Sequence, residues 1–106
     1  MDFEKLLNFI DLENKRLTAR FKNKSKQERI YSRAIKLTEE LGELCNEVLA
    51  FNKDQRKEKM NKHSKSNLPN EFADVVIASM LLAKLMNVDI ETALENKIKT
   101  INKRYK

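Results

Sequence analysis

Apolar residues recur along the first half of the chain at intervals of three and four, the spacing of one face of an α-helix. This pattern predicts one amphipathic helix over roughly residues 2–20 and a second from about residue 26 to about residue 52. Their apolar positions are Phe3, Leu6, Leu7, Ile10 and Leu17, then Ile30, Leu37, Leu41, Leu44 and Val48. The polar stretch KNKSK, residues 22–26, is expected to join the two helices.

A long polar segment, residues 53–68, interrupts this pattern and is rich in lysine. It is predicted to be a loop, and a loop of this length in a compact domain suggests a functional loop or lid. A third helix is predicted to start at Pro69-Asn70, with Asn70 or Asn67 as its cap.

The third helix is apolar nearly all round from Phe72 to Met86, which is typical of a central buried helix. After a short turn, Asp89 is predicted to cap a fourth helix that runs to the C-terminus. Its apolar positions are Ile90, Leu94, Ile98 and Ile101. We therefore expect residues 1–106 to form a single all-α domain, a four- to five-helix bundle.

Composition agrees with a few long helices, because 106 residues contain one glycine and one proline. A chain this short buries only a modest core, so association into a homodimer or a higher even oligomer is expected. Cys45 is the only cysteine, so an internal disulfide is excluded and a reducing, cytoplasmic setting is indicated. Cys45 itself is expected to be a small residue of the core.

Neither a targeting segment nor a membrane span is expected. The N-terminus lacks the positive and then apolar pattern of a signal peptide. The longest apolar stretch, residues 72–86, is interrupted by Asp74, Ser79 and Lys84, and so falls short of a membrane span.

The formal net charge is +6, and the basic residues are clustered. Residues 14–36 hold nine Lys or Arg against one acid, residues 52–66 hold six against two, and residues 97–106 hold five against none. Such patches attract polyanions, either nucleic acid or the phosphates of a nucleotide.

Four glutamates stand out against this basic background. A nine-residue segment of the predicted second helix contains Glu39, Glu40, Glu43 and Glu47. At about 100° per residue they share one wedge of the helix beside the apolar stripe. Like charges four residues apart repel, so the arrangement costs helix stability. It indicates either a solvated acidic face paired with lysines or a set of ligands for a cation.

A second acidic pair, Glu71 and Asp74, repeats the three-residue spacing of Glu40 and Glu43. Asp74 is expected to point into the bundle, where a buried carboxylate must be paired or bind a metal. Two such pairs on adjacent helices can direct four carboxylates at one point. Oxygen ligands in this number suit Mg²⁺ or Mn²⁺.

Three segments, KLTEELGELCNEV, EFADVVIA and VDIETALENKIKTINKRY, resemble the MazG-type all-α nucleotide pyrophosphohydrolases over roughly residues 30–105. The signature of that family is EExxE, a spacer and ExxD. Here a spacer of 27 residues separates Glu39-Glu40-Leu41-Gly42-Glu43 from Glu71-Phe72-Ala73-Asp74. The resemblance implies Mg²⁺-dependent hydrolysis of nucleoside triphosphates between the α and β phosphates, by dimers or by tetramers made of dimers.

The same resemblance assigns roles to single residues. It places metal ligands at Glu40, Glu43, Glu71 and Asp74. Glu39 matches the leading glutamate of the signature and is the candidate for activating or positioning the water.

The last helix departs slightly from the family, which has Lys-x-x-x-Asn followed by Arg and Tyr. Here Lys97 and Asn102 are five residues apart, and Arg104 follows. The resemblance implies phosphate or sugar contacts for these three residues, and an ordinary basic helix end is the alternative. Lys36, one turn before Glu40, is a further candidate phosphate contact or the partner in a plain ion pair. No tryptophan is present to stack on a base, so base specificity stays open.

The leading hypothesis is therefore a Mg²⁺-dependent hydrolase that converts a (d)NTP and water into a (d)NMP and pyrophosphate, by in-line attack of water on phosphorus. Phosphoribosyl-ATP or dUTP are alternative substrates for the same scaffold. A different class of function is a small basic helical module that binds nucleic acid or a protein without catalysis. An inward-facing Asp74 favours the enzyme, because a binding module gains nothing from a buried acidic cluster.

Overall fold

The structure of the protein is a computed structural model, and it describes residues 1–51 and 67–105. Within those residues there are four helices and no strands, which confirms the predicted all-α class. The helices are α1 (Phe3–Arg20), α2 (Lys26–Phe51), α4 (Asn67–Leu85) and α5 (Ile90–Lys103). Most of the predicted loop at 53–68 lies outside the described residues, and its last two positions belong to α4.

Side-chain caps fix where three of the helices begin. The carboxylate of Asp2 accepts the backbone N–H of Lys5 at 2.8 Å and so caps α1. At the start of α2, Ser25 and Glu28 form a reciprocal capping box, each side chain accepting the backbone N–H of the other residue. Asp89 accepts the N–H and the hydroxyl of Thr92, which confirms it as the cap of α5.

The start of α4 differs from the prediction. The helix begins at Asn67, two residues before Pro69, so Asn67 is its first residue and Asn70 lies inside it. Proline is tolerated there because the first-turn N–H groups have no partner within the helix. At the other end, Asn87 adopts a left-handed conformation with φ 59°, and Val88 donates its N–H to the carbonyl of Ala83 at 2.9 Å. This hydrogen bond reaches back five residues, as at a Schellman helix end, and α4 stops there.

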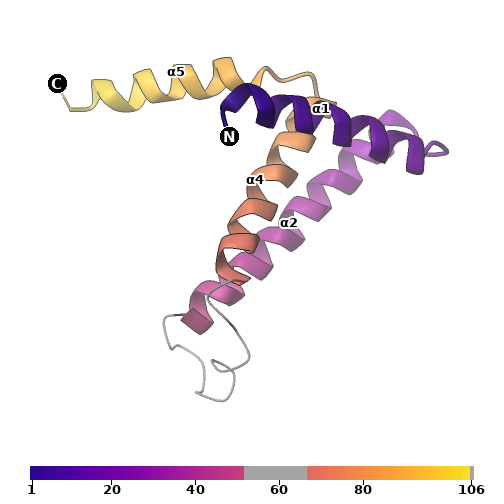
Figure 1. Ribbon diagram of the computed structural model, residues 1–106, viewed down its shortest axis with the longest axis horizontal. Coiled ribbons are helices and arrows are strands. Elements are labelled where there is room, and N and C mark those ends of the chain that lie inside the picture. Colours follow the sequence, from indigo (N-terminus) through magenta and orange to yellow (C-terminus); the bar gives the residue numbers. More distant parts are fainter. Residues whose placement is uncertain (52–66, 106) are drawn as a thin grey trace.

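Helices α2 and α4 run antiparallel along each other, and α1 lies across one end of the pair (Figure 1). A small core forms where α1 crosses α4, around the buried side chains of Ile10, Met80 and Leu81. The apolar residues predicted for the first helix pack against this core or belong to it: Phe3, Leu6, Leu7, Ile10 and Leu17. The helical periodicity of residues 2–20 therefore identified the correct face of α1.

Arg33 of α2 ties the three helices together. Its guanidinium donates to the side-chain oxygen of Asn14 on α1 at 2.8 Å and to the carbonyl of Leu81 on α4 at 2.9 Å. A second link between α1 and α4 is the ion pair of Asp11 with Lys84 at 3.3 Å. Lys15 and Lys84 hydrogen-bond the Asp11 carboxylate and hold its pKa below the ordinary value.

The expectation that α4 is a central buried helix is wrong for the single chain. Phe72 and Val76 are 53% and 49% exposed, and only Met80 and Leu81 of this helix are buried. Apolar composition predicts that a helix needs covering on all sides, but it does not say what provides the cover. In the described residues α2 packs along one side of α4, α1 crosses near its C-terminal end, and α5 contacts only that end (Figure 1).

Two further burial predictions are wrong. Asp74 is exposed and not buried in the bundle. Cys45 is also exposed, because two residues turn a helix by about 200° and so place Cys45 almost opposite Glu43, which faces α4.

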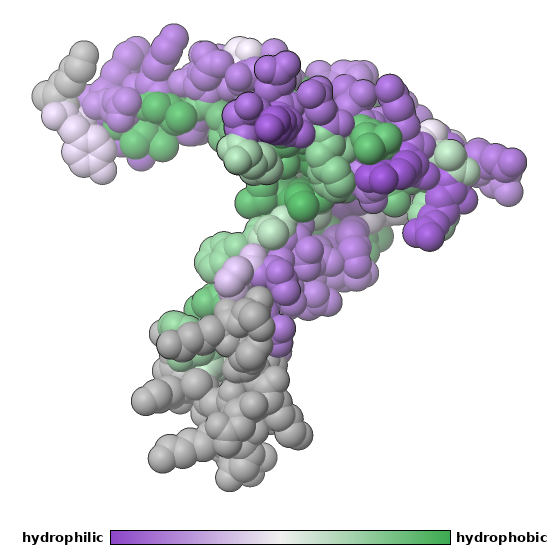
Figure 2. All heavy atoms as spheres, in the orientation of Figure 1, coloured by the Kyte–Doolittle hydropathy of each residue, from purple (hydrophilic) through white to green (hydrophobic). Residues whose placement is uncertain are grey.

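Helix α5 projects away from the rest of the molecule (Figure 1). None of its residues is buried, and Leu94, Ile98 and Ile101 are 44%, 56% and 39% exposed. Hydrophobic atoms form a band along one side of α5 and continue along the adjacent edge of α4 (Figure 2). None of the described helices is both long enough and apolar enough to traverse a lipid bilayer.

Candidate metal centre and adjoining cavity

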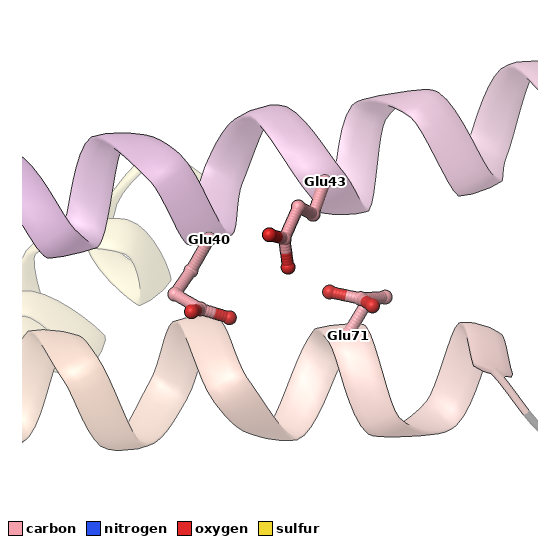
Figure 3. Close-up of side chains that lie close together, drawn as sticks. All are labelled: Glu40, Glu43 and Glu71. Atoms are coloured by element: carbon pink, nitrogen blue, oxygen red, sulfur yellow. The ribbon is translucent and has the colours of Figure 1, made fainter.

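The α2–α4 pair brings three carboxylates together from two helices. Glu40 and Glu43 point from α2 toward α4, and Glu71 points back from α4 toward Glu43 (Figure 3). One oxygen of each lies within 4.8 Å of one oxygen of each of the others. Residues three apart on one helix share a face, so the predicted spacing of Glu40 and Glu43 is what allows both to reach Glu71.

Glu40 is the only charged residue among the buried side chains of the described chain, with 7% of its surface exposed. Its Oε1 accepts from Lys36 Nζ at 3.0 Å, whereas its Oε2 is buried without a hydrogen-bond partner. Glu71 likewise has a buried Oε2 without a partner. Buried charged oxygens are costly unless they are compensated, so these atoms fit a site for a cation between the helices.

Desolvation and the crowding of carboxylates raise the pKa of both Glu71 and Asp74. Desolvation, followed by repulsion from Glu43 and Asp74, raises the pKa of Glu71. Desolvation also raises the pKa of Asp74, and the charge of Glu40 and a hydrogen bond to that residue add to the effect. Although Asp74 is exposed, it lies near Glu40, next to the three carboxylates whose oxygens are within 4.8 Å of one another. Hard carboxylate oxygens in this number suit Mg²⁺ or Mn²⁺.

Glu39 and Lys36 lie at the edge of this group. The Glu39 side chain is 59% exposed, and its carboxylate lies 4.0 Å from Lys36 Nζ. Lys36 also pairs with Glu40, and this contact, followed by the charges of Glu39 and Glu43, raises its pKa. Lys36 therefore remains charged beside the carboxylates.

The predicted contacts on the last helix lie elsewhere in the chain. Lys97 and Asn102 belong to α5, and Arg104 is its C-cap residue. Helix α5 contacts α4 but no other described helix, and it points away from the α2–α4 pair (Figure 1). A single chain therefore does not bring these three residues to the carboxylates.

A cavity of about 550 Å³ adjoins the carboxylate group and was not expected from the sequence. Glu40 and Asp74 line it together with residues of α1, the α1–α2 turn and the first half of α2. Five cations also line it: Arg20, Lys24, Arg29, Arg33 and Lys36. The sequence does not distinguish these five from the other basic residues of 14–36, and only the fold shows which of them line the cavity.

Family comparison agrees with the geometry of the carboxylates. Residues 30–106 match the MazG nucleotide pyrophosphohydrolase domain, which is more than half of the chain. The chain belongs to this family. The match includes all four carboxylates, most of α2, and the whole of α4 and α5, and it begins after α1. Neither the curated proteins nor the solved structures gave a match to the chain.

The raised pKa values of this MazG-type chain lead to a prediction about stability. A raised carboxyl pKa means that the folded protein binds the proton more tightly than the unfolded chain does. Stability without metal should therefore fall as pH rises from the ordinary value for Glu, 4.5, through the raised value of Glu71. Glu71→Gln should have a higher melting temperature than the wild type at neutral pH, and the difference should shrink toward pH 4.5.

The same measurement with added Mg²⁺ separates a cation site from simple repulsion. Mg²⁺ should raise the melting temperature of the wild type at neutral pH and have little effect on Glu71→Gln, which lacks one of the expected ligands. Glu95→Gln serves as a control because Glu95 is exposed on α5 and its change removes the same charge. Equal Mg²⁺ responses in all three proteins would contradict a site at Glu71.

Proposed function

We propose that this protein is a Mg²⁺-dependent nucleoside triphosphate pyrophosphohydrolase that converts a (d)NTP and water into a (d)NMP and pyrophosphate. The observation that carries the proposal is the buried Glu40, which has an Oε2 without a hydrogen-bond partner and an oxygen within 4.8 Å of oxygens of Glu43 and Glu71. In a MazG-type chain, such oxygens are expected where a cation and a phosphate meet.

Glu40, Glu43, Glu71 and Asp74 are proposed to hold the Mg²⁺, and Mn²⁺ is expected to substitute because it accepts the same oxygen ligands. When bound, the cation supplies positive charge that polarises phosphate oxygens. The four carboxylates come from two helices. At neutral pH, binding of a divalent cation is expected to relieve their repulsion better than protonation of two of them.

Glu39 and Lys36 are proposed to act on the reacting groups. Glu39 directly precedes Glu40 on α2, and its side chain is 59% exposed. Its carboxylate is therefore open to water and can orient a water molecule or accept its proton. Lys36 keeps its charge between Glu39 and Glu40, where it can offset negative charge on the phosphate oxygens.

Lys97, Asn102 and Arg104 remain proposed phosphate or sugar contacts. Since α5 of one chain points away from the carboxylates, these residues would act on the site of a second copy in a homodimer or homotetramer. The exposed apolar side of α5 supports such an assembly.

A panel of canonical and modified (d)NTPs with Mg²⁺ tests the proposal, with pyrophosphate and orthophosphate measured separately. We expect one pyrophosphate for each nucleotide consumed and no orthophosphate. Release of orthophosphate would indicate attack at the terminal phosphate, and the absence of hydrolysis across the panel would contradict the proposed activity. The panel includes dUTP, which tests one of the alternative substrates directly.

A further inference from the structure

The cavity beside the carboxylates has two chemically different ends. Glu40 and Asp74 line one end, and the α1–α2 turn with the first turns of α2 lines the other. Glu40 lies eleven positions after Arg29, which corresponds to about 16 Å along α2. The intervening wall is partly apolar, with Leu17, Ile77 and Leu81 contributing to it. A cavity of about 550 Å³ is within the usual range for a small-molecule site.

Lys24 and Arg29 are held in place at the far end by neutral partners. Lys24 Nζ donates to the hydroxyl of Ser32 at 3.2 Å and lies 5.2 Å from the centre of the Phe21 ring. The Arg29 guanidinium donates to the carbonyl of Phe21 at 3.3 Å, while its Nε is buried without a partner. These contacts position both cations and leave their charge unneutralised.

No carboxylate of the described chain forms an ion pair with Lys24, Arg29 or Arg33. Two acids that influence them electrostatically have other contacts. Glu13 is paired with Arg16 at 2.9 Å, and Glu28 accepts the backbone N–H of Ser25 at 2.8 Å.

Arg29 and Arg33 lie one turn apart on α2 and repel each other. Desolvation and then the charge of Arg29 lower the pKa of Arg33. Arg33 already donates to Asn14 and Leu81, so it serves the fold. The cations available to a ligand at this end of the cavity are therefore Arg29 and Lys24.

We propose that Lys24 and Arg29 bind a phosphate group of the substrate that the carboxylate centre does not hold. This inference rests on the proposed function, because it assumes that the scissile phosphates lie at the carboxylates. The group has two sources: the terminal phosphates that leave as pyrophosphate, or a second phosphate on the nucleoside side of the substrate. Either would bring a negative group to Lys24 and Arg29, which form no ion pair with a carboxylate of the described chain.

Titration calorimetry with Mg²⁺ and ligands that are not hydrolysed tests the site without relying on turnover. The ligands are α,β-methylene ATP, pyrophosphate, adenosine monophosphate and an adenosine bisphosphate with a phosphate on each of two ribose oxygens. The variants are Arg29→Gln and Lys24→Gln, with Lys26→Gln as a matched control. Lys26 lies two residues from Lys24 and carries the same charge, but it does not line the cavity.

We expect the wild type to bind α,β-methylene ATP or the bisphosphate, and both cavity variants to weaken that binding by about tenfold or more, as for loss of a charge-assisted hydrogen bond. Lys26→Gln should stay within about twofold of the wild type. Circular dichroism checks that Arg29→Gln is folded, and Lys24→Gln provides an independent test because Lys24 is exposed.

The ligands then identify the source of the phosphate. Weaker binding of pyrophosphate and α,β-methylene ATP, with adenosine monophosphate unchanged, would assign the site to the leaving group. If the wild type binds the bisphosphate more tightly than adenosine monophosphate and the cavity variants bind both equally, the site belongs to a second phosphate on the nucleoside side. Cavity variants that bind every ligand as Lys26→Gln does, or a wild type that binds none, would overturn the proposal. A wild type that binds these ligands more tightly than the cavity variants do, but hydrolyses no nucleotide of the (d)NTP panel, would contradict the proposed function and leave this site supported.

Discussion

Replacing Glu43 with Gln or Asp74 with Asn is expected to lower pyrophosphate release by roughly a hundredfold or more, because each change removes a charged oxygen ligand from the proposed Mg²⁺ site. Both side chains are exposed, so neither change opens a cavity in the core. The measurement is the steady-state rate of pyrophosphate release at saturating Mg²⁺, on the triphosphate that the wild type hydrolyses fastest.

The stability of the same variants separates a functional loss from a folding defect. Each substitution removes one negative charge from a group in which carboxylates repel one another, as the raised pKa values of Glu71 and Asp74 indicate. Melting temperatures without metal should therefore equal or exceed that of the wild type. Glu95→Gln, an exposed change on α5, should alter neither activity nor stability. Full activity of either site variant would exclude the four-carboxylate centre.

The helices could be predicted from the sequence because their periodicity and caps are local. The apolar spacing over residues 2–20 and the Asp89 cap were confirmed, since both depend on residues close together in the chain. The start of α4 was placed too late, because proline is compatible with any position of a first turn and does not mark the first residue.

The metal centre could be predicted only in part. Spacing placed Glu40 and Glu43 on one face of a helix, but their meeting with Glu71 depends on how α2 packs against α4. A helical wheel gives the direction of Asp74 without showing whether another element covers it, and in the described chain it is exposed. Arg29 was missed because its guanidinium differs from the neighbouring basic residues only through the cavity that it lines.

Charging the apolar side of α5 is expected to dissociate the homodimer or higher oligomer proposed for this chain. The radius of gyration is 16.9 Å, against about 13 Å for a compact domain of this length. Ile98 is 56% exposed between Leu94 and Ile101, and Phe72 adds exposed apolar surface on α4. Water contact with so much apolar surface is unfavourable, and a second copy can remove it symmetrically.

Sedimentation velocity at micromolar concentration should show a dimer or a higher even oligomer for the wild type. Ile98→Glu should raise the dissociation constant by about a hundredfold or more, because burying Ile is worth about 1.5–3 kcal/mol and a two-fold interface loses it twice. Thr100→Glu adds the same charge about 200° further round α5 and should leave the assembly intact. A monomeric wild type, or an unchanged dissociation constant in Ile98→Glu, would contradict association through α5. It would also exclude the delivery of Lys97 and Arg104 to a second copy by this route.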